Sequence, residues 1–419
     1  MSAQLATALD LNLETLKLGG STNPSHSLIK EAIKSRLAEY QALSLDIHAT
    51  PEVSNYEFHA CEVLSKQLEK EGFTVTTDVA GHRTGFSAVF DSGKPGPTIS
   101  FLAEYDALPG LGHACGHNLF GVYSALAAVA LSTLPNLVGK LLVYGTPGEE
   151  GGENGSAKGS FVREGFFDGV DAALCAHPGV HYKPTGQTLA VDPVDVKFYG
   201  APSHAAGAPE HGINALEALI QVFNGINALR LHLPKDVNIH GIITHGGDAP
   251  NIIPEFASGR FFLRAANRQT LNMVYQKVEN IVKGAALATG CTHDFGLFQN
   301  AVDDTIITPL FDDVFMSHFE GSGVPEKDID LEPKASFGSS DVGNVSQVIP
   351  TIQPTVSISD DFMAGHTVAF REASASPKGL ASIGIVAELL SKTALDLMEK
   401  PLLLAAVKAQ HQESLKRGN

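Results

Sequence analysis

The sequence has no tryptophan and only four cysteines in 419 residues. The cysteines (Cys61, Cys115, Cys175 and Cys291) are too few and too widely spaced for the disulfide framework of a small secreted protein. Basic residues are also scarce, since 29 Lys and Arg stand against 46 Asp and Glu, and the formal net charge is -17. Because phosphate binding depends on clustered cations, we expect neither a nucleic acid nor an anionic membrane as a partner.

Long hydrophobic runs are absent too, and no segment approaches the roughly 20 apolar residues that a membrane-spanning helix needs. Residues 1–20 lack the basic start and apolar stretch of a signal peptide, so we expect a cytoplasmic protein. The chain is 43% hydrophobic and 18% charged, which is typical of a globular protein. Its length favours two domains.

The first part of the chain shows helices that alternate with short apolar runs. Helical spacing over 25–72 is interrupted near Pro51, and an alanine-rich helix is predicted from Asn118 to Leu134. Strands are predicted at 99–106, 140–150 and 171–179, and this alternation indicates a parallel sheet. Ligands bind beyond the carboxyl ends of such strands, so functional residues are expected there.

The pattern changes at about residue 190. Strand and helix patterns then follow in an order typical of a small α+β module inserted into the first domain. The strand–helix pattern returns after about 305, with a buried strand at 348–358 and a closing helix at 377–398. We therefore predict an α/β fold with one domain made of residues 1–189 and 304–419 and a second domain made of residues 190–303.

The segment Gly112–Leu119 holds the densest cluster of candidate ligands, with His113, Cys115 and His117 in five positions. Its glycines favour a tight loop, and Asn118 would cap the following helix. A thiol at a helix N-terminus has a lowered pKa, and the thiolate binds metal. Mixed Cys and His ligands suit zinc. The alternative is a loop whose Cys and His simply pack in the core.

Glu149 and Glu150 follow the strand predicted at 140–150. Neighbouring side chains of an extended chain point in opposite directions, so one carboxylate could bind metal while the other accepts a proton from water. A solvated acidic loop would also explain the pair. His177 ends another predicted strand and His366 follows a late one, and each alone is weak evidence. Together with Cys115, His117 and Glu150 they offer a ligand set for two metal ions.

The inserted module contributes three further candidates. His204 follows a predicted strand and could donate to a developing oxyanion, although an exposed His at a helix start is the simpler explanation. Asn251 follows a glycine-rich turn, and Arg264 lies on a strand, where its guanidinium could bind a substrate carboxylate or form a structural ion pair. Asp341 lies in a polar, glycine-rich turn that could line a pocket or only connect elements.

Eight motifs in the same order make the chain resemble the aminoacylase/carboxypeptidase family of metallopeptidases, in its amidohydrolase subfamily of hippurate hydrolases and indole-acetyl-amino-acid hydrolases. The motifs cover most of the chain: HATPEVSNYE, AEYDALPGLGHACGHNL, PGEEGG, CAHPG, GAPSHAAGAPEHGINAL, GGDAPNIIPE, SSDVGNVS and GHT. Within the subfamily the sequence is most similar to the aminobenzoyl-glutamate hydrolase subunit and a related basic-dipeptide hydrolase branch.

The resemblance implies a zinc-peptidase α/β/α sandwich with an inserted ferredoxin-like domain that acts as a lid and forms a homodimer. It implies two divalent ions, with zinc as the first candidate and manganese, cobalt or nickel as alternatives. Cys115 would bind both ions, His117 and His177 would complete one shell, and Glu150 and His366 the other.

The resemblance also implies roles around the reaction. Glu149 would be the general base and then the acid, and Asp106 would orient a ligand. His204 would act in the active site of the partner subunit, while Asn251 and Arg264 would bind the substrate. The sequence departs from the common pattern at Glu104 and Asn118, where many members carry Asp, and Asn118 cannot supply a charge.

These features predict metal-dependent hydrolysis of an amide bond in a small N-acyl amino acid or dipeptide. Two alternatives remain open. One is a non-catalytic metal-binding regulatory or partner subunit of the same fold. The other is a cysteine hydrolase in which Cys115 works with His113 or His117.

Overall fold

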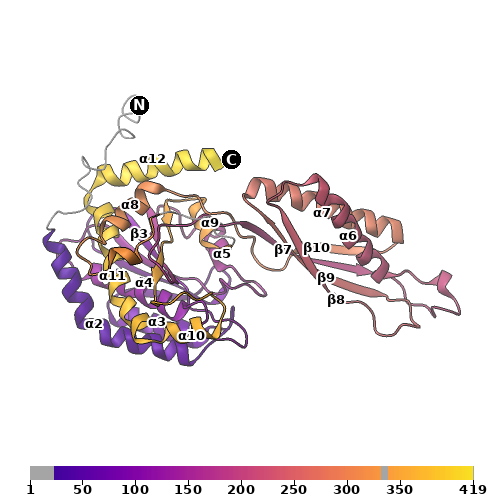
Figure 1. The fold of residues 1–419 in the computed structure, drawn as a ribbon, viewed down its shortest axis with the longest axis horizontal. Helices are drawn as coiled ribbons and strands as arrows, with labels where there is room; N and C mark the ends of the chain where they lie inside the picture. The colour runs from indigo at the N-terminus through magenta and orange to yellow at the C-terminus, as the bar shows by residue number, and fades with distance from the viewer. Residues whose placement is uncertain (1–22, 332–337, 419) are drawn as a thin grey trace. The chain divides into compact units, whose positions relative to one another are not determined.

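The computed structural model describes residues 23–331 and 338–418. The N-terminal stretch from which we predicted the absence of a signal peptide lies outside these residues. The chain divides into two compact units, whose elements are labelled in Figure 1. Unit 1 comprises the described residues 23–187, 305–331 and 341–418, and unit 2 comprises 188–304 and 338–340. The segment 338–340, which we had assigned to the first domain, thus belongs to unit 2.

Unit 1 contains a six-stranded mixed sheet in the order β1-β2-β4-β3-β5-β11. Four neighbours are parallel, as predicted: β4 (Lys140–Gly145), β3 (Thr98–Ala103), β5 (Ala172–Leu174) and β11 (Thr351–Ile352). Two strands that we did not predict make the sheet mixed, because β1 (Thr74–Val79) and β2 (His82–Asp91) pair antiparallel and β2 also runs antiparallel to β4. This pairing places the carboxyl ends of β3 and β4 side by side.

Two predicted strands each prove to be two short ones. The segment 171–179 divides into β5 and β6 (His177–Gly179), and 348–358 divides into β11 and β12 (Thr355–Ser357). The first member of each pair belongs to the six-stranded sheet, whereas β6 and β12 form a separate parallel pair. The chain thus leaves the six-stranded sheet after Leu174, so His177 lies beyond the carboxyl end of β5.

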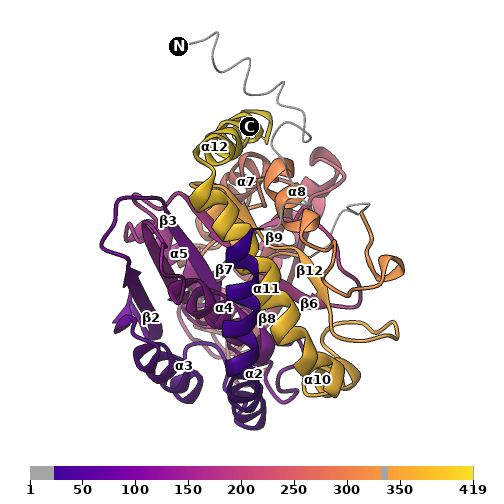
Figure 2. The same ribbon diagram turned by 90° about the vertical axis from the view of Figure 1, so that its left-hand side faces the viewer.

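Helices cover the sheet of unit 1. The alanine-rich α4 (His117–Ser132) is buried along its length and packs on β3 and β4. Figure 2 shows α2 (Pro24–Ala49) and α11 (Pro377–Glu399) beside α4, and both contact it. The remaining helices are α3 (Phe58–Lys70), α5 (Ala157–Arg163), α8 (Pro309–Ser317), α9 (Val342–Ser346), α10 (Val368–Ser374), α12 (Pro401–Gly418) and the short η3 (Glu326–Asp328).

Unit 2 is a four-stranded antiparallel sheet with two helices on it. The chain order is β7 (Ala190–Tyr199), α6 (Ala215–Leu229), β8 (Asn238–His245), β9 (Phe256–Ala265), α7 (Arg268–Thr289) and β10 (Thr292–Leu297), with the short helices η1 (Pro209–His211) and η2 (Arg230–His232). The sheet order β10-β7-β9-β8 and this connectivity are those of a ferredoxin-like fold. The predicted fold class, an α/β domain with an inserted ferredoxin-like module, is confirmed.

Each unit has its own buried apolar core. Strand β9 alternates buried and half-buried positions, which is the pattern of a sheet with one face on a core. Among the described residues, no helix is both long enough and apolar enough to cross a membrane.

Candidate metal centre

The loop before α4 places Cys115 and His117 at the edge of the sheet. Gly116 has a φ of 79° and a β-carbon there would lie 2.9 Å from Pro178, so only glycine fits this turn without strain. The helix begins at His117. Our prediction that Asn118 caps it is wrong, because Asn118 lies in the first turn, where its side chain donates to Ser44 Oγ and the Ser374 carbonyl.

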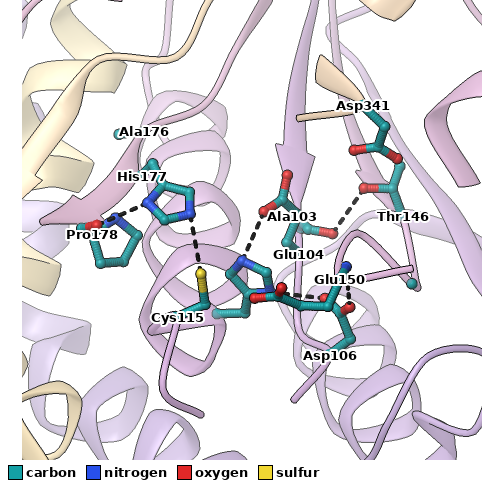
Figure 3. Close-up of polar contacts among 12 residues, drawn as sticks. Ala103, Glu104, Asp106, Cys115, Thr146, Glu150, Ala176, His177, Pro178 and Asp341 are labelled. Carbon is teal, nitrogen blue, oxygen red and sulfur yellow. Dashed lines mark hydrogen bonds and ion pairs between the residues drawn. The ribbon is translucent and has the colours of Figure 1, made fainter. Parts of the chain in front are cut away.

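Five candidate ligands meet around this loop. The donor atoms of Cys115, His117 and His177 all lie within 4.8 Å of one another, and so do those of Cys115, Glu150 and His366. The Cys115 sulfur lies 3.7 Å from His177 Nε2 and 3.6 Å from His366 Nε2. Figure 3 shows Cys115 directed at the ring of His177, with Glu150 beside Asp106. Segments separated by up to 251 residues in the chain thus converge on one sulfur atom.

Hydrogen bonds orient the two histidines of the first set. His117 Nδ1 lies 2.8 Å from Asp106 Oδ1, and His177 Nδ1 lies 2.8 Å from the Pro178 carbonyl oxygen. A carbonyl oxygen can only accept a hydrogen bond, so Nδ1 of His177 carries the proton. Nε2 then keeps a lone pair that can bind a metal ion. Burial opposes protonation of His117, but the Asp106 charge and hydrogen bond outweigh it and raise its pKa well above the usual value.

The loop after β4 presents the paired glutamates. Glu57, which is fully buried, accepts a hydrogen bond from the Gly148 backbone at 2.9 Å, and Asp106 Oδ2 accepts one from the Glu150 backbone at 2.9 Å. Gly148 has a φ of 70°, and a β-carbon there would lie 2.5 Å from Ser54 Oγ. The loop is therefore held by its backbone, which leaves the side chains of Glu149 and Glu150 available.

The two glutamates have different electrostatic surroundings. Burial and the neighbouring carboxylates of Glu104 and Glu150 raise the pKa of Glu149 well above its usual value. Burial also opposes ionisation of Glu150, but the hydrogen bond from His366 and the charge of His117 outweigh it and lower its pKa to about 2. Glu150 is thus an anion suited to binding a cation, and Glu149 is the better proton carrier.

His366 completes the second set from a strained position. Its φ of 58° is left-handed, and its backbone N–H donates to the Ala114 carbonyl at 3.0 Å. Its Nε2 lies 3.4 Å from Glu150 Oε2, and its side chain is 58% exposed. The hydrogen bond with Glu150 raises the pKa of His366. Strain of this kind is retained where surrounding contacts hold it, as the bond to Ala114 does here.

The environment of Cys115 corrects one expectation. We expected the helix N-terminus to lower the pKa of its thiol, but burial and the Glu150 charge raise it well above its usual value. His113, the other partner considered for a cysteine nucleophile, donates from Nε2 to the Ile47 carbonyl instead, 3.1 Å away. A thiolate at Cys115 therefore needs a compensating cation.

The three candidates of unit 2 form no such cluster. His204 is exposed, and its Nδ1 accepts from the backbones of Ala206 and Gly207. Asn251 is exposed, and its carbonyl accepts from the Ala205 backbone. Arg264 lies on β9 as predicted, and its guanidinium donates to Ser339 Oγ at 3.1 Å and His240 Nε2 at 3.3 Å. These partners are a hydroxyl and an imidazole, and among the described residues of unit 2 Arg264 forms no ion pair with a carboxylate.

Sequence reasoning missed several residues beside the cluster. Lys158, on α5, is fully buried, and its ammonium lies 2.7 Å from Glu104 and 2.6 Å from Asp341. Glu104 had been noted only as a departure and Asp341 only as part of a turn. A lysine in the segment that follows the paired glutamates gives no sign of burial in the sequence, because its partners come from distant segments.

A cavity of about 270 Å³ opens beside Cys115 and His177. Its wall is mainly apolar, and the residues that line it besides these two are Pro178, Gly179, Val180, His181, Lys183, Thr355, Met363, Gly365 and Phe370. The Lys183 ammonium is paired with Asp330 at 3.1 Å. The cavity can therefore accept a small apolar group next to the candidate ligands.

Comparisons with known proteins show the family to which the chain is similar. Residues 193–289, within unit 2, match the peptidase dimerisation domain of the M20 peptidases. The chain is 34% identical over 415 residues to the human Xaa-Arg dipeptidase, an alignment that covers 93% of this chain and 94% of that protein. It is 36% identical over 289 residues to a p-aminobenzoyl-glutamate hydrolase subunit of Escherichia coli, over 64% of this chain and 59% of that protein.

A solved structure shares the fold. It is a Bacillus subtilis protein described as a dinuclear metal binding peptidase from the M20 family, with a TM-score of 0.58 and 20% identity, over 86% of this chain and 99% of that one. The identity to the human dipeptidase extends over nearly the whole of both chains. The chain belongs to the M20 family of peptidases.

Proposed function

We propose that this enzyme hydrolyses the amide bond of a small N-acyl amino acid or dipeptide, using two divalent metal ions. The observation that carries the proposal is the meeting of five donor groups in two sets that share Cys115. Zinc is the first candidate, because sulfur and imidazole donors suit it, and manganese, cobalt or nickel are alternatives. The names of the two relatives, a dipeptidase and an aminobenzoyl-glutamate hydrolase, support this substrate class.

The donor set fits such ions. Zinc–sulfur and zinc–nitrogen bonds of about 2.3 and 2.1 Å at a tetrahedral angle place the two donor atoms about 3.6 Å apart. The Cys115 sulfur lies 3.7 and 3.6 Å from the Nε2 atoms of His177 and His366. In addition, His117 Nε2 and Glu150 Oε1 are buried and form no hydrogen bond. Buried polar atoms without partners are costly, and a bound cation would satisfy both.

Each group would have a distinct role. Cys115 would bind both ions, His117 and His177 one of them, and Glu150 and His366 the other. Bound ions would polarise the amide carbonyl and make a water acidic enough to lose a proton near neutral pH. Glu149, with its raised pKa, would accept that proton and then protonate the leaving amine. Asp106 would hold His117 in position through Nδ1.

The substrate and the partner subunit supply the remaining roles. The apolar cavity beside Cys115 would receive the acyl group or first side chain of the substrate. His204 would stabilise the oxyanion in the active site of the partner subunit, and Asn251 and Arg264 would bind the substrate carboxylate or carbonyl. This proposal requires a homodimer formed through unit 2, in keeping with its match to a dimerisation domain.

Elemental analysis of the purified protein, coupled to a hydrolysis screen, tests the proposal. We expect two bound ions and hydrolysis of an N-acyl amino acid or dipeptide, with Xaa-Arg dipeptides and aminobenzoyl-glutamate as first substrates. A chelator should abolish the activity and added metal should restore it. Activity that survives chelation but not thiol alkylation would indicate a cysteine hydrolase. Two bound ions without hydrolysis of any such substrate would indicate a non-catalytic subunit.

A further inference from the structure

A buried charge cluster adjoins the candidate metal centre and is not used by the proposed mechanism. It consists of Lys158, Glu104 and Asp341, all of them fully or almost fully buried. Asp341 accepts hydrogen bonds from the Lys158 ammonium at 2.6 Å and from the Lys158 backbone at 3.0 Å. Glu104 Oε1 lies 2.7 Å from the same ammonium. Glu104 and Asp341 are both labelled in Figure 3.

The second oxygen of Glu104 faces the metal centre. Oε2 lies 3.2 Å from His117 Nε2, an ion pair when the ring is protonated, and neither atom has a further hydrogen-bond partner although both are buried. Ligand atoms of Glu104, His117 and Glu149 all lie within 4.8 Å of one another, which makes them a third group able to hold a cation. Apart from each other, these two buried atoms have no partner, and a ligand held by both would satisfy them, because burial without a partner is costly.

The charges of the cluster are also favourable for binding a cation. Lys158 contributes one positive charge, whereas Glu104 and Asp341 contribute a carboxylate each and Glu149 lies within their electrostatic range. Excess negative charge in a buried site is unfavourable unless a cation balances it. An ion held at His117 Nε2 would supply this charge where Glu104 Oε2 already points.

We propose that Glu104 is a further metal-binding residue of this centre, and that Lys158 and Asp341 position its carboxylate for this role. The inference rests on the proposed binding of metal. Lys158 holds Oε1 and thereby leaves Oε2 as an oxygen donor for the ion that His117 binds. Carboxylate oxygen is a harder ligand than sulfur or imidazole, so Glu104 increases the affinity for manganese more than that for zinc.

The test compares Glu104→Gln, Lys158→Met and the double variant. Each protein is stripped with chelator, its melting temperature is measured, and it is then equilibrated with buffered free Zn²⁺ or Mn²⁺ before elemental analysis. In E104Q we expect one of the two ions to bind at least tenfold more weakly, with the larger loss for Mn²⁺. In K158M we expect both ions to be retained, because the Glu104 charge remains. The ion weakened in E104Q should still bind a few-fold more weakly than in the wild type, because the carboxylate has lost the partner that positions it.

The double variant shows whether Glu104 is a metal ligand or only a structural partner of Lys158. Removing both charges should return the melting temperature of the metal-free protein towards that of the wild type, and one ion should still be lost. It also provides the test if E104Q alone does not fold. Asp312→Asn is the matched control, because Asp312 is a buried carboxylate of unit 1 that is held by Thr185. This control should bind both ions normally.

The outcomes are distinguishable. If the wild type takes up two ions and E104Q binds both with unchanged affinity, the role of Glu104 is wrong while the proposed function stands. If the double variant recovers both thermal stability and metal binding, Glu104 is only a structural partner of Lys158. If the wild type binds no ion, the metal-dependent function and the role of Glu104 both fail.

Discussion

Units 1 and 2 present their candidate residues in opposite ways. In unit 1, Cys115, His117 and Glu150 come from separate segments, meet within a few ångströms and are largely withdrawn from water. In unit 2, His204 and Asn251 are exposed on loops, and Arg264 donates to neutral partners. Unit 1 therefore assembles a chemical site on its own. The candidate residues of unit 2 form no such cluster within their own unit.

The candidate ligands of unit 1 are held in place before any metal ion or substrate binds. Hydrogen bonds already fix the rings of His117 and His177 and the backbone of the Glu149–Glu150 loop. Sites held by such supporting contacts bind and react without reorganisation. Exposed side chains such as His204 remain adaptable, and this suits recognition of a substrate. Substitutions in the two units should therefore affect different measurements.

The largest effect is expected at Glu149. Replacing it with Gln should reduce kcat by about a thousandfold or more, because the group that carries the proton is lost while the candidate ligands remain. Metal content, measured by elemental analysis, should stay at the wild-type level. Glu153→Gln, an exposed carboxylate of the same loop, is the control and should keep full activity. Normal turnover in E149Q would show that another group carries the proton.

Cysteines of the two units provide the next comparison. Cys115→Ser should weaken binding of both ions by about 100-fold or more, because the shared sulfur donor is replaced by a poorer hydroxyl. Cys291, buried in unit 2, contacts the Asn214 carbonyl, so Cys291→Ser should leave metal binding unchanged. Titration with a competing metal indicator measures both affinities. Loss of a single ion in C115S would mean that the sulfur does not bridge.

His204 tests whether unit 2 takes part in the reaction. Its replacement by Ala should lower kcat about 100-fold, which is the usual cost of losing one oxyanion donor, with metal content unchanged. His211, an exposed histidine nearby in the sequence, is the matched control. Mixing the inactive H204A and E149Q proteins should restore part of the activity if His204 acts in the partner subunit. Absence of recovery in confirmed mixed dimers would place its action within one chain.

Buried carboxylates in the two units differ in how they are neutralised. Asp192 of unit 2 pairs with Arg268 at 2.7 Å. Among the described residues, the hydrogen bonds to the Asp312 carboxylate of unit 1 come from Thr185, and burial raises the pKa of Asp312 to about 7. Between pH 5 and pH 7 the folded state thus keeps a proton that the unfolded chain has lost, so stability should fall as the pH rises.

The free energy of unfolding should fall by at most about 2.5 kcal/mol between pH 5 and pH 7, since one bound proton contributes about 1.4 kcal/mol per pH unit. Chemical denaturation of the metal-free protein at both pH values measures it, and Asp312→Asn should flatten the slope. An unchanged slope in this variant would mean that other groups determine the pH dependence.

Local patterns in the sequence predicted the main elements well. The alanine-rich tract became α4, and the two periodic segments of unit 2 became α6 and α7, because apolar spacing determines which face a helix can bury. The division of 171–179 and 348–358 into pairs of short strands was missed. In each segment both short strands are apolar, so the sequence does not show where one ends. Which sheet each strand joins depends on the neighbouring strands in the folded protein.

The amino-acid sequence was enough to predict the kinds of candidate ligand and their positions just beyond the predicted strands, because sulfur, imidazole and carboxylate groups follow apolar runs there. Only the tertiary structure decided that Cys115 lies between His177 and His366, and that Lys158 is buried between Glu104 and Asp341. Distances between residues far apart in the chain depend on packing, and so do burial and the pKa shifts that follow from it.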